Sequence, residues 1–478
     1  MPNLTRMQFL AAGTAVAGGG LLALGEREPA TAAAGTKGVA TAGSAAAPAP
    51  FTERMPVPRV LEPERDGGLD RYRIPIRPGT AQILPGLQTP VYTYGPDFLA
   101  PVIRARTGRP VTVTFANLLD EVTNVHLHGG HVPAGMDGHP LDVIQPGAKR
   151  DYTYPNGQRA STLWFHSHAH MMEGEHTYKG LHGFYIIEDP VERGMGLPTG
   201  DYDVPILLRD AQFDAAGNLV FGNPALRTTV LANGKVQPYF PVEARKYRIR
   251  LLNAAVEGVF QLTLDGAPMV QIASDGGLLP APVPRTDLTM CSGERVELVV
   301  DFGRCEPGSQ VLLSDPTRGP VLRFDVGPRT GDDSRVPDRF RPLPVLPRAT
   351  NTRDVVLSFD LSGPQPVGLV NGRPYDPNRV DFVIRRGTTE IWNVTNGDGA
   401  MGFLHDFHMH LTMFRVLDRT GAPMTPNDAG LKDTVLIPPG TTVRVQATFD
   451  GFLGRYAYHC HFMEHADVGM MAQMEIVP

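Results

Sequence analysis

Short runs of alternating apolar and polar residues, separated by turns, extend along the chain from about residue 51. Residues 109–117 (RPVTVTFAN) and 294–302 (ERVELVVDF) show the alternation expected of a β-strand that buries one face. Glycine and proline are frequent, at 52 and 45 residues, which suits many turns between short strands. The pattern therefore predicts an all-β protein.

A strand that ends in asparagine occurs three times, at residues 109–117, 247–253 and 390–396. The final asparagines of these strands are 136 and 143 residues apart (253 − 117 and 396 − 253). Each copy also contains a later turn that opens another strand, with the glycines Gly147, Gly293 and Gly440. We therefore predict one β-sandwich unit that is repeated three times.

The repeat divides the chain into domains at residues 51–190, 200–330 and 350–478. The candidate joints are residues 189–203, which contain proline and glycine, and residues 328–353, where proline and arginine are dense and the strand alternation fails. A length of 478 residues agrees with this division, since one domain takes on the order of 150 residues.

Residues 1–50 read as an export signal followed by a flexible tether. In residues 1–24, Arg6 precedes an apolar run that is too short to span a bilayer as a stable helix. The residues around Arg6 resemble the twin-arginine export motif, although Met7 stands where the second arginine belongs. Residues 26–50 are rich in alanine and proline. We expect an exported protein without stable membrane insertion, and an ordinary disordered N-terminus is the alternative.

Charge excludes one class of partner. The formal net charge is −6 and no basic run occurs, so a nucleic-acid partner is not expected. The sequence leaves the oligomeric state open.

Cys291 and Cys305 are expected to be buried free thiols. The strand predicted at residues 294–302 separates them by roughly 30 Å when extended, whereas a disulfide needs Cα atoms within about 7 Å. The third cysteine, Cys460, lies among histidines in the stretch YHCHFMEHADVGM.

All 15 histidines fall within residues 126–182 and 405–465. Alternate residues of a strand share a face, so four pairs of histidines each point one way. These pairs are His126 and His128, His166 and His168, His408 and His410, and His459 and His461. One such pair alone is usually structural. Four pairs in two windows instead predict a cluster of eight histidines that binds several metal ions.

Cys460 faces away from its neighbours His459 and His461. His405 is an odd number of residues from His408 and His410, so its side chain points to the opposite face of the strand. It can therefore join Cys460 and His465. Met470 follows His465 by five residues. A cysteine with two histidines and a weak, distant methionine is the ligand set of a blue-copper electron-transfer centre.

The four histidine segments resemble the copper motifs of the multicopper oxidases. They begin at His126, His166, His405 and His459, and read H-x-H-G, H-x-H, H-x-x-H-x-H and H-C-H-x-x-x-H. The resemblance covers about residues 55–478. Further stretches, LANGK, SDGGL and FRVLD, look like the group of bacterial spore-coat laccase, phenoxazinone synthase and bilirubin oxidase.

This resemblance implies three consecutive cupredoxin-like Greek-key β-sandwich domains and four copper ions. The type 1 copper is expected to bind His405, Cys460, His465 and Met470, and the type 2 copper His126 and His408. The two type 3 coppers are expected to bind the remaining six histidines, which are His128, His166, His168, His410, His459 and His461.

The middle copy of the repeat is expected to bind no copper. In the first copy, His126 and His128 follow Asn117 by nine and eleven residues. At the same distances after Asn253, the middle copy has Leu262 and Leu264. We expect this domain to be a spacer or wall.

The implied activity is that of a laccase-like oxidase. A phenolic or aminophenolic reductant would give up one electron at a time at the type 1 site, beside His465. Dioxygen would be reduced to two waters at the three-copper cluster. Asp137 stands where similar enzymes carry a carboxylate that supplies protons, although an aspartate before glycine is also a common turn residue. Ala466 stands where similar enzymes often have an acid.

Several alternatives remain open. One is oxidation of Cu(I) in copper tolerance, and another is bilirubin-oxidase-like activity. The eight cluster histidines oppose an electron carrier or copper store, and the H-C-H motif opposes a copper nitrite reductase.

We expect Met171 and Met172 to pack in the core. The other histidines, predicted to be loop residues or donors that support the ligands, are His131, His139, His170, His176 and His182.

Overall fold

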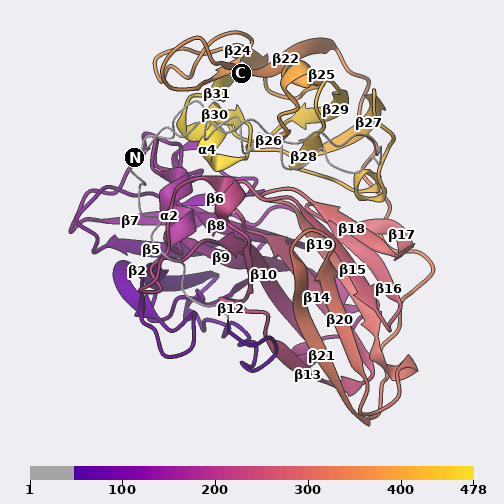
Figure 1. Ribbon diagram of the computed structural model, residues 1–478. Coiled ribbons are helices and arrows are strands. Elements are labelled where there is room, and N and C mark those ends of the chain that lie inside the picture. The colour runs from indigo at the N-terminus through magenta and orange to yellow at the C-terminus, as the bar shows by residue number, and fades with distance from the viewer. Residues whose placement is uncertain (1–47) are drawn as a thin grey trace, which may run out of the picture.

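The computed structural model describes residues 48–478. The predicted export signal and most of the tether lie outside these residues. Among the described residues, no helix has both the length and the apolar character that a membrane span requires. The strands of residues 48–478 form six sheets, two in each of three consecutive stretches of the chain (Figure 1).

The elements of the first stretch are β1 (Glu64–Asp66), β2 (Leu69–Ala81), β3 (Thr89–Tyr94), β4 (Ile103–Arg106), β5 (Val111–Asn117), β6 (His126–His128), β7 (Lys149–Tyr154), β8 (Ser161–His166), α2 (Glu173–Lys179), β9 (His182–Glu188) and α3 (Pro190–Arg193). One sheet has the order β1-β2-β5-β7, with β3 paired to β2, and the other has the order β4-β9-β8-β6.

The strands of the second stretch are β10 (Asp203–Ala211), β11 (Thr229–Ala232), β12 (Lys235–Val236), β13 (Tyr239–Ala244), β14 (Lys246–Asn253), β15 (Phe260–Asp265), β16 (Met269–Ser274), β17 (Gly277–Arg285), β18 (Asp287–Met290), β19 (Arg295–Asp301), β20 (Gln310–Asp315) and β21 (Gly319–Arg329). Their sheets have the orders β12-β11-β10-β14-β19-β16-β17 and β13-β21-β20-β15-β18.

The elements of the third stretch are β22 (Asn351–Asp360), β23 (Val367–Val370), β24 (Phe382–Arg385), β25 (Thr388–Asn396), β26 (His405–Met409), β27 (Phe414–Thr420), β28 (Thr434–Ile437), β29 (Thr442–Phe449), β30 (Gly454–His459), α4 (Met463–Asp467) and β31 (Met471–Val477). The sheets have the orders β23-β22-β25-β29-β27 and β24-β31-β30-β26-β28.

The three stretches share one topology. In each, the strand that ends in asparagine pairs in parallel with the first long strand of its sheet: β5 with β2, β14 with β10, and β25 with β22. The second sheet of each stretch also contains one parallel pair: β4 with β9, β13 with β21, and β24 with β31. The predicted all-β fold with three sandwich units is confirmed.

The three asparagines make the same hydrogen bonds. The side-chain amide of Asn117, Asn253 or Asn396 donates to two backbone carbonyls of its own stretch, at 2.8 to 3.0 Å. The amide oxygen accepts from the backbone N–H two residues later. The repeat therefore preserves a buried side chain that closes the turn after the strand, which explains why asparagine recurs at this position.

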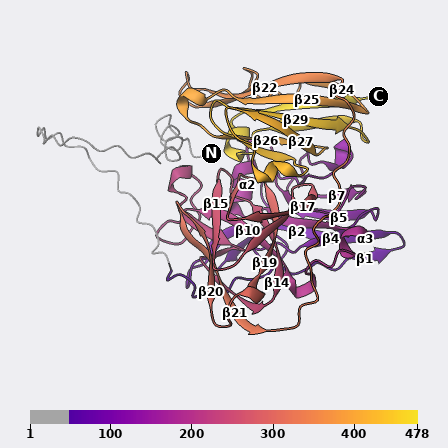
Figure 2. The ribbon, with the colours of Figure 1, turned by 90° about the vertical axis from the view of Figure 1, so that its right-hand side faces the viewer.

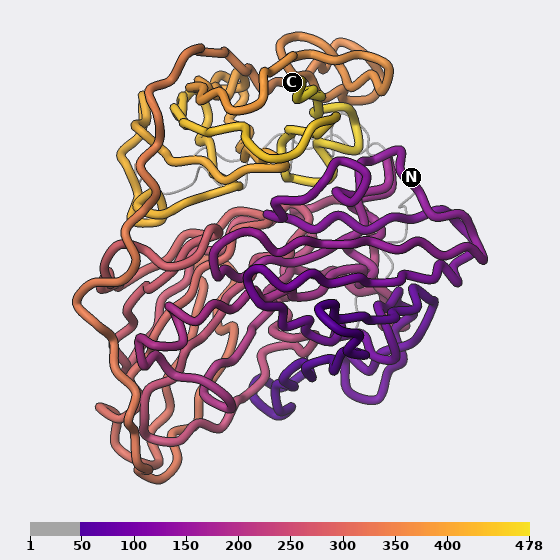
Figure 3. The backbone as a smooth tube through the Cα atoms, turned by 180° about the vertical axis from the view of Figure 1, so that it is seen from behind, coloured from indigo at the N-terminus to yellow at the C-terminus, as the bar shows by residue number. Residues whose placement is uncertain are grey.

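Each stretch has its own apolar core, and a further cluster joins all three. This joining cluster contains Trp164 of β8, Leu252 of β14 and Met463 of α4. Figures 1 and 2 show the third stretch, in orange and yellow, lying over the junction between the first two. Residues 331–349 contain no helix or strand and run along the outside from the second stretch to the third (Figure 3).

The predicted state of two cysteines is also confirmed. Strand β19 separates Cys291 from Cys305, and both are buried free thiols. Cys291 packs in the core of the third stretch, although it lies in the second stretch of the sequence.

We predict that Asn253→Ala destabilises the protein because it leaves two buried carbonyls and one N–H without their partner. The free energy of unfolding should fall by about 3 kcal/mol. Urea denaturation measures this change, with the exposed Asn378 as control, since Asn378→Ala should cost less than about 0.5 kcal/mol. Equal stability of the two variants would contradict the role assigned to this asparagine.

Candidate metal centre

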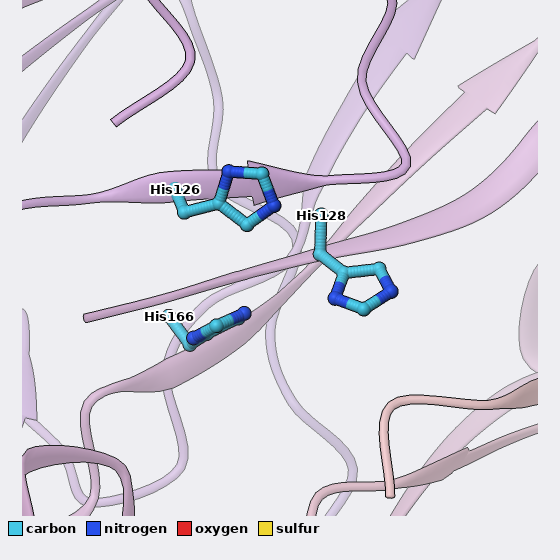
Figure 4. Close-up of side chains that lie close together, drawn as sticks. All are labelled: His126, His128 and His166. Carbon is cyan, nitrogen blue, oxygen red and sulfur yellow. The ribbon is translucent and has the colours of Figure 1, made fainter. Parts of the chain in front are cut away.

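Two strands of the first stretch present histidines to one space. β6 carries His126 and His128, and β8 ends at His166. The two strands pair with His126 opposite His166, so the imidazoles approach one another, as Figure 4 shows. His168 follows β8 by two residues and points the same way, which agrees with the parity expected of alternate residues.

The third stretch supplies the other four histidines. β26 pairs with β30 so that His408 lies opposite His459. The imidazoles of the two stretches then meet: the ring centroids of His126 and His410 are 3.9 Å apart, and those of His128 and His408 are 3.7 Å apart. All eight side chains predicted for the cluster are buried. The cluster therefore lies between the first and third stretches.

Each of these imidazoles turns one nitrogen toward the others. In the part of the chain that the structure describes, five of these buried nitrogens have no hydrogen-bond partner: Nδ1 of His128 and Nε2 of His126, His166, His408 and His461. The Nε2 atoms of His168 and His459 lie 3.3 and 3.2 Å from Nε2 of His410. Buried polar atoms are rarely left unpaired. A set of convergent, unpaired imidazole nitrogens fits metal ions.

The opposite nitrogen of each imidazole is held by the protein. Nδ1 of His126 donates to the backbone carbonyl of Asp137 at 2.6 Å, and Nδ1 of His408 donates to that of Asp433 at 2.9 Å. Nδ1 of His459 donates to the carbonyl of Cys460 at 2.9 Å. A proton fixed on one nitrogen leaves the lone pair of the other free to bind metal.

Carboxylates hold the rings of three other histidines. Oδ2 of Asp137 is 2.7 Å from Nδ1 of His410. Oε2 of Glu173 is 2.9 Å from Nδ1 of His168, and a third acid, Asp433, contacts His128. Burial raises the pKa of the Asp137 carboxyl well above its usual range and raises the pKa of Glu173 to about 7. The sequence predicted Asp137 at this place, but it gave no sign of Glu173 or Asp433, because neither belongs to a histidine motif.

Burial also lowers the pKa of all eight imidazoles below the ordinary value of 6.5. The histidines are therefore neutral at physiological pH. Neutral imidazole is the form that binds metal, so the cluster is already in the protonation state that copper requires.

A second site forms around Cys460. Its Sγ lies 3.4 Å from Nδ1 of His465 and 3.9 Å from Nδ1 of His405. The two Nδ1 atoms are 3.2 Å apart, so one thiol and two imidazole nitrogens face a common point. Met470, the predicted fourth ligand, is buried in the same apolar cluster as Cys460, and its carbonyl accepts the Cys460 N–H at 3.1 Å.

Two aspartates that the sequence did not indicate support this second site. Oδ2 of Asp398 is 2.9 Å from Nε2 of His405, which turns Nδ1 of that ring toward Cys460. Oδ1 of Asp406 accepts from the backbone N–H groups of His461 and Phe462, at 2.6 and 2.9 Å. Asp406 therefore fixes the chain on the far side of Cys460, between the two sites.

His465 is the most exposed of the four predicted ligands of the second site, at 3%, whereas the other three are fully buried. Its Nε2 faces Oε1 of Glu257 at 3.7 Å. Glu257 belongs to the loop between β14 and β15, so the second stretch contributes a carboxylate beside this imidazole.

Other sequence predictions have mixed outcomes. His176 supports the cluster, since its Nδ1 is 2.9 Å from Oγ of Ser167, which lies between two of the cluster histidines. His139 contacts Gln473.

The prediction that Met171 packs in the core is wrong, because this residue is 52% exposed. Met171 lies in the loop before α2 and has a positive φ of 62°. In the middle stretch Leu262 is buried in the apolar core.

Comparisons with known proteins agree with this geometry. Family models described as multicopper oxidase match residues 76–192 and 342–478. The chain belongs to the multicopper oxidase family. It is 33% identical to a laccase of Bacillus subtilis (strain 168), over 89% of this chain and 98% of the relative. It is 34% identical to the bilirubin oxidase of Albifimbria verrucaria, over 88% and 80%.

A solved structure gives the same result for the fold. The crystal structure of a laccase from Pediococcus acidilactici superposes with a TM-score of 0.83, at 31% sequence identity, over 90% of this chain and 95% of that chain. This multicopper oxidase is therefore a laccase-like, copper-dependent oxidoreductase that uses dioxygen as electron acceptor.

We predict that the oxidase binds four copper ions per chain when metal-free protein is reloaded and excess metal is removed. The reason is that the eight convergent histidines and the Cys460 site are separate groups of ligands. Metal analysis of loaded, active protein checks this number. A content of two or fewer would contradict the assignment of the two sites.

Proposed function

We propose that this oxidase takes electrons one at a time from small phenolic or aminophenolic compounds and reduces dioxygen to two waters. The observation that carries the proposal is the position of Cys460 between His459 and His461. The thiol belongs to one site, while the imidazoles of the neighbouring residues belong to the other. One short piece of backbone therefore links the Cys460 site, which would accept the electrons, to the cluster of eight histidines.

We assign the copper types by resemblance to the multicopper oxidases. His405, Cys460, His465 and Met470 would hold the type 1 copper, and His126 and His408 the type 2 copper. Copper held by thiolate, imidazole and thioether cycles between Cu(I) and Cu(II) and so supplies one-electron transfer. The type 3 pair would take the six histidines left over, which are His128, His166, His168, His410, His459 and His461.

His465 is the proposed point of entry for electrons. It is the least buried of the type 1 ligands, and its Nε2 faces Glu257. A carboxylate at this place can accept a hydrogen bond from the O–H or N–H group of a phenol or aminophenol. The reductant would then lie against the edge of the imidazole that accepts its electron.

Asp137 is proposed to serve the cluster as a proton-holding group. It is fully buried, and its carboxylate lies 2.7 Å from Nδ1 of His410 and 3.6 Å from Nδ1 of His126. It therefore touches one histidine of the type 2 set and one of the type 3 set. Ala466 has no acidic group to share this task.

Dioxygen uptake with a methoxyphenol, with bilirubin and with Cu(I) tests the choice of reductant. We expect the highest kcat/KM with the phenol. A clear preference for Cu(I) would instead establish a copper-tolerance oxidase, and a preference for bilirubin would establish a bilirubin oxidase. The absence of dioxygen uptake with all three reductants would contradict the proposal.

We also propose that the protein is exported, since residues 1–24 carry a basic residue followed by an apolar run. N-terminal sequencing of protein recovered from outside the producing cell tests this. Intact, unprocessed protein found only inside the cell would contradict it.

We predict that Cys460→Ser abolishes the visible absorption of the type 1 site and turnover with every reductant. Serine is nearly isosteric but cannot reproduce a copper–thiolate bond. The eight cluster histidines face the other way, so the type 2 and type 3 coppers should remain. Absorption spectra, metal analysis and dioxygen uptake measure these effects.

Cys305→Ser is the matched control, since it changes another buried thiol that lies outside both sites. It should keep native absorption and turnover. Phenol oxidation by Cys460→Ser at a near-native rate would disprove the electron path through this residue.

A further inference from the structure

The middle stretch reaches the histidine cluster, although no ligand is assigned to it among the described residues. The turn before β19 lies against two imidazoles. A Cβ added to Gly293, which has φ +80°, would lie 2.9 Å from Cε1 of His461 and 3.0 Å from Cε1 of His128. Oγ of Ser292 is 3.1 Å from Nδ1 of His461. The middle stretch therefore forms part of the wall of the histidine cluster.

Arg295 extends this contact to a carboxylate of the third stretch. Its Nη1 and Nη2 lie 2.7 and 2.5 Å from Oδ1 and Oδ2 of Asp433, which is a bidentate pair. The guanidinium also donates from Nε to the carbonyl of Thr162 at 2.9 Å, and its residue is fully buried. One side chain of the middle stretch thus contacts both the first and the third stretches.

Asp433 in turn contacts a cluster histidine. Its Oδ1 is 2.9 Å from Nε2 of His128, and Oγ1 of Thr434 is 3.1 Å from the same nitrogen. His128 differs from the other seven cluster histidines of the described chain, because its Nδ1 rather than its Nε2 is the inward, unpartnered nitrogen. A neutral imidazole carries one N–H. An acceptor at Nε2 therefore leaves the lone pair at Nδ1.

We propose that Arg295 is a positioning residue, which holds Asp433 so that His128 presents Nδ1 to the type 3 copper pair. The inference rests on the copper assignment proposed above. Without the guanidinium, the buried carboxylate would lose its only bidentate cation among the described residues and would shift or take up another partner. His128 would then lose the acceptor that fixes both its tautomer and the orientation of its ring.

Asp433 is held by a wider set of charges. The backbone N–H of Asp433 is 3.3 Å from Oδ2 of Asp275, and the N–H of Arg295 is 2.8 Å from Oδ1 of the same carboxylate. Lys432 pairs with Asp275 at 3.0 Å. Asp275 therefore aligns the start of β19, which carries Arg295, with the residue that precedes β28, Asp433. The planar fork of arginine completes a geometry that lysine, with one point charge, cannot reproduce.

The test compares copper-loaded wild type with Arg295→Lys and with Arg250→Lys. Arg250 is a matched control, since it is also buried in the middle stretch and pairs with the carboxylates of Asp203 and Glu297. Three quantities are measured: copper retained against a chelator, the near-ultraviolet absorption of a coupled copper pair, and the visible absorption of the type 1 site. Thermal unfolding is followed in parallel.

We expect Arg295→Lys to release type 3 copper at about 10–100-fold lower chelator concentration and to lose most of the near-ultraviolet band. Its visible type 1 absorption should be unchanged. Arg250→Lys should lower thermal stability to a similar degree but keep both spectral features. If Arg295→Lys retained copper and the near-ultraviolet band as wild type does, the role of Arg295 would be overturned.

Asp433→Asn provides a second variant if Arg295→Lys does not fold. Oδ1 of Asp433 faces both Nη1 of Arg295 and Nε2 of His128. In asparagine an amide N–H donor replaces Oδ2, so Nη2 of Arg295 loses its acceptor and the bidentate pair is broken. Asp433→Asn should also lose type 3 copper and the near-ultraviolet band while it keeps the visible type 1 absorption. If it retained copper and the near-ultraviolet band as wild type does, the inference would be contradicted. A wild-type protein that lacks the near-ultraviolet band would refute the copper assignment itself, which separates that failure from a failure of this inference.

Discussion

The structure depends on one constraint: eight neutral imidazoles must point one nitrogen each into a space between two domains that are distant in the sequence. In every ring, the nitrogen that faces away from the cluster forms a hydrogen bond with a backbone carbonyl, a hydroxyl or a carboxylate. These bonds fix the protons on the outer nitrogens, so the inner ones remain free for metal. Burial supports the same state, because it lowers the pKa of all eight histidines.

The two halves of the cluster stay together because charged contacts cross the interfaces. Asp467 of α4 accepts from the backbone N–H groups of Glu173 and Gly174 at the start of α2, at 3.2 and 2.9 Å. Arg227 of the middle stretch pairs with Glu464 at 2.7 and 2.9 Å. The helix that carries His465 is thus fixed to both other stretches. Such pairs stabilise only when their geometry is good, which makes the domain arrangement specific.

The ligand positions follow from the sequence because strand periodicity is local. Alternate residues of a strand share a face, so parity alone places His126 with His128 and separates His405 from His408. In the middle copy, Leu262 stands at the position that corresponds to His126 of the first copy. The same rule therefore shows that the middle copy lacks this pair of ligands. Exposure of Met171 was not predicted, since a loop with positive φ leaves no periodic pattern.

The sequence by itself determined the β fold, its threefold repeat, and the grouping of histidines around Cys460. Each of these rests on neighbours within a few residues, which backbone geometry controls. Only the tertiary structure decided which nitrogen of each imidazole faces inward, because that choice depends on acceptors far away in the chain. Asp433 lies 305 residues from His128, and Arg295 lies 138 residues from Asp433. No spacing rule connects such residues, and packing of the three domains alone brings them together.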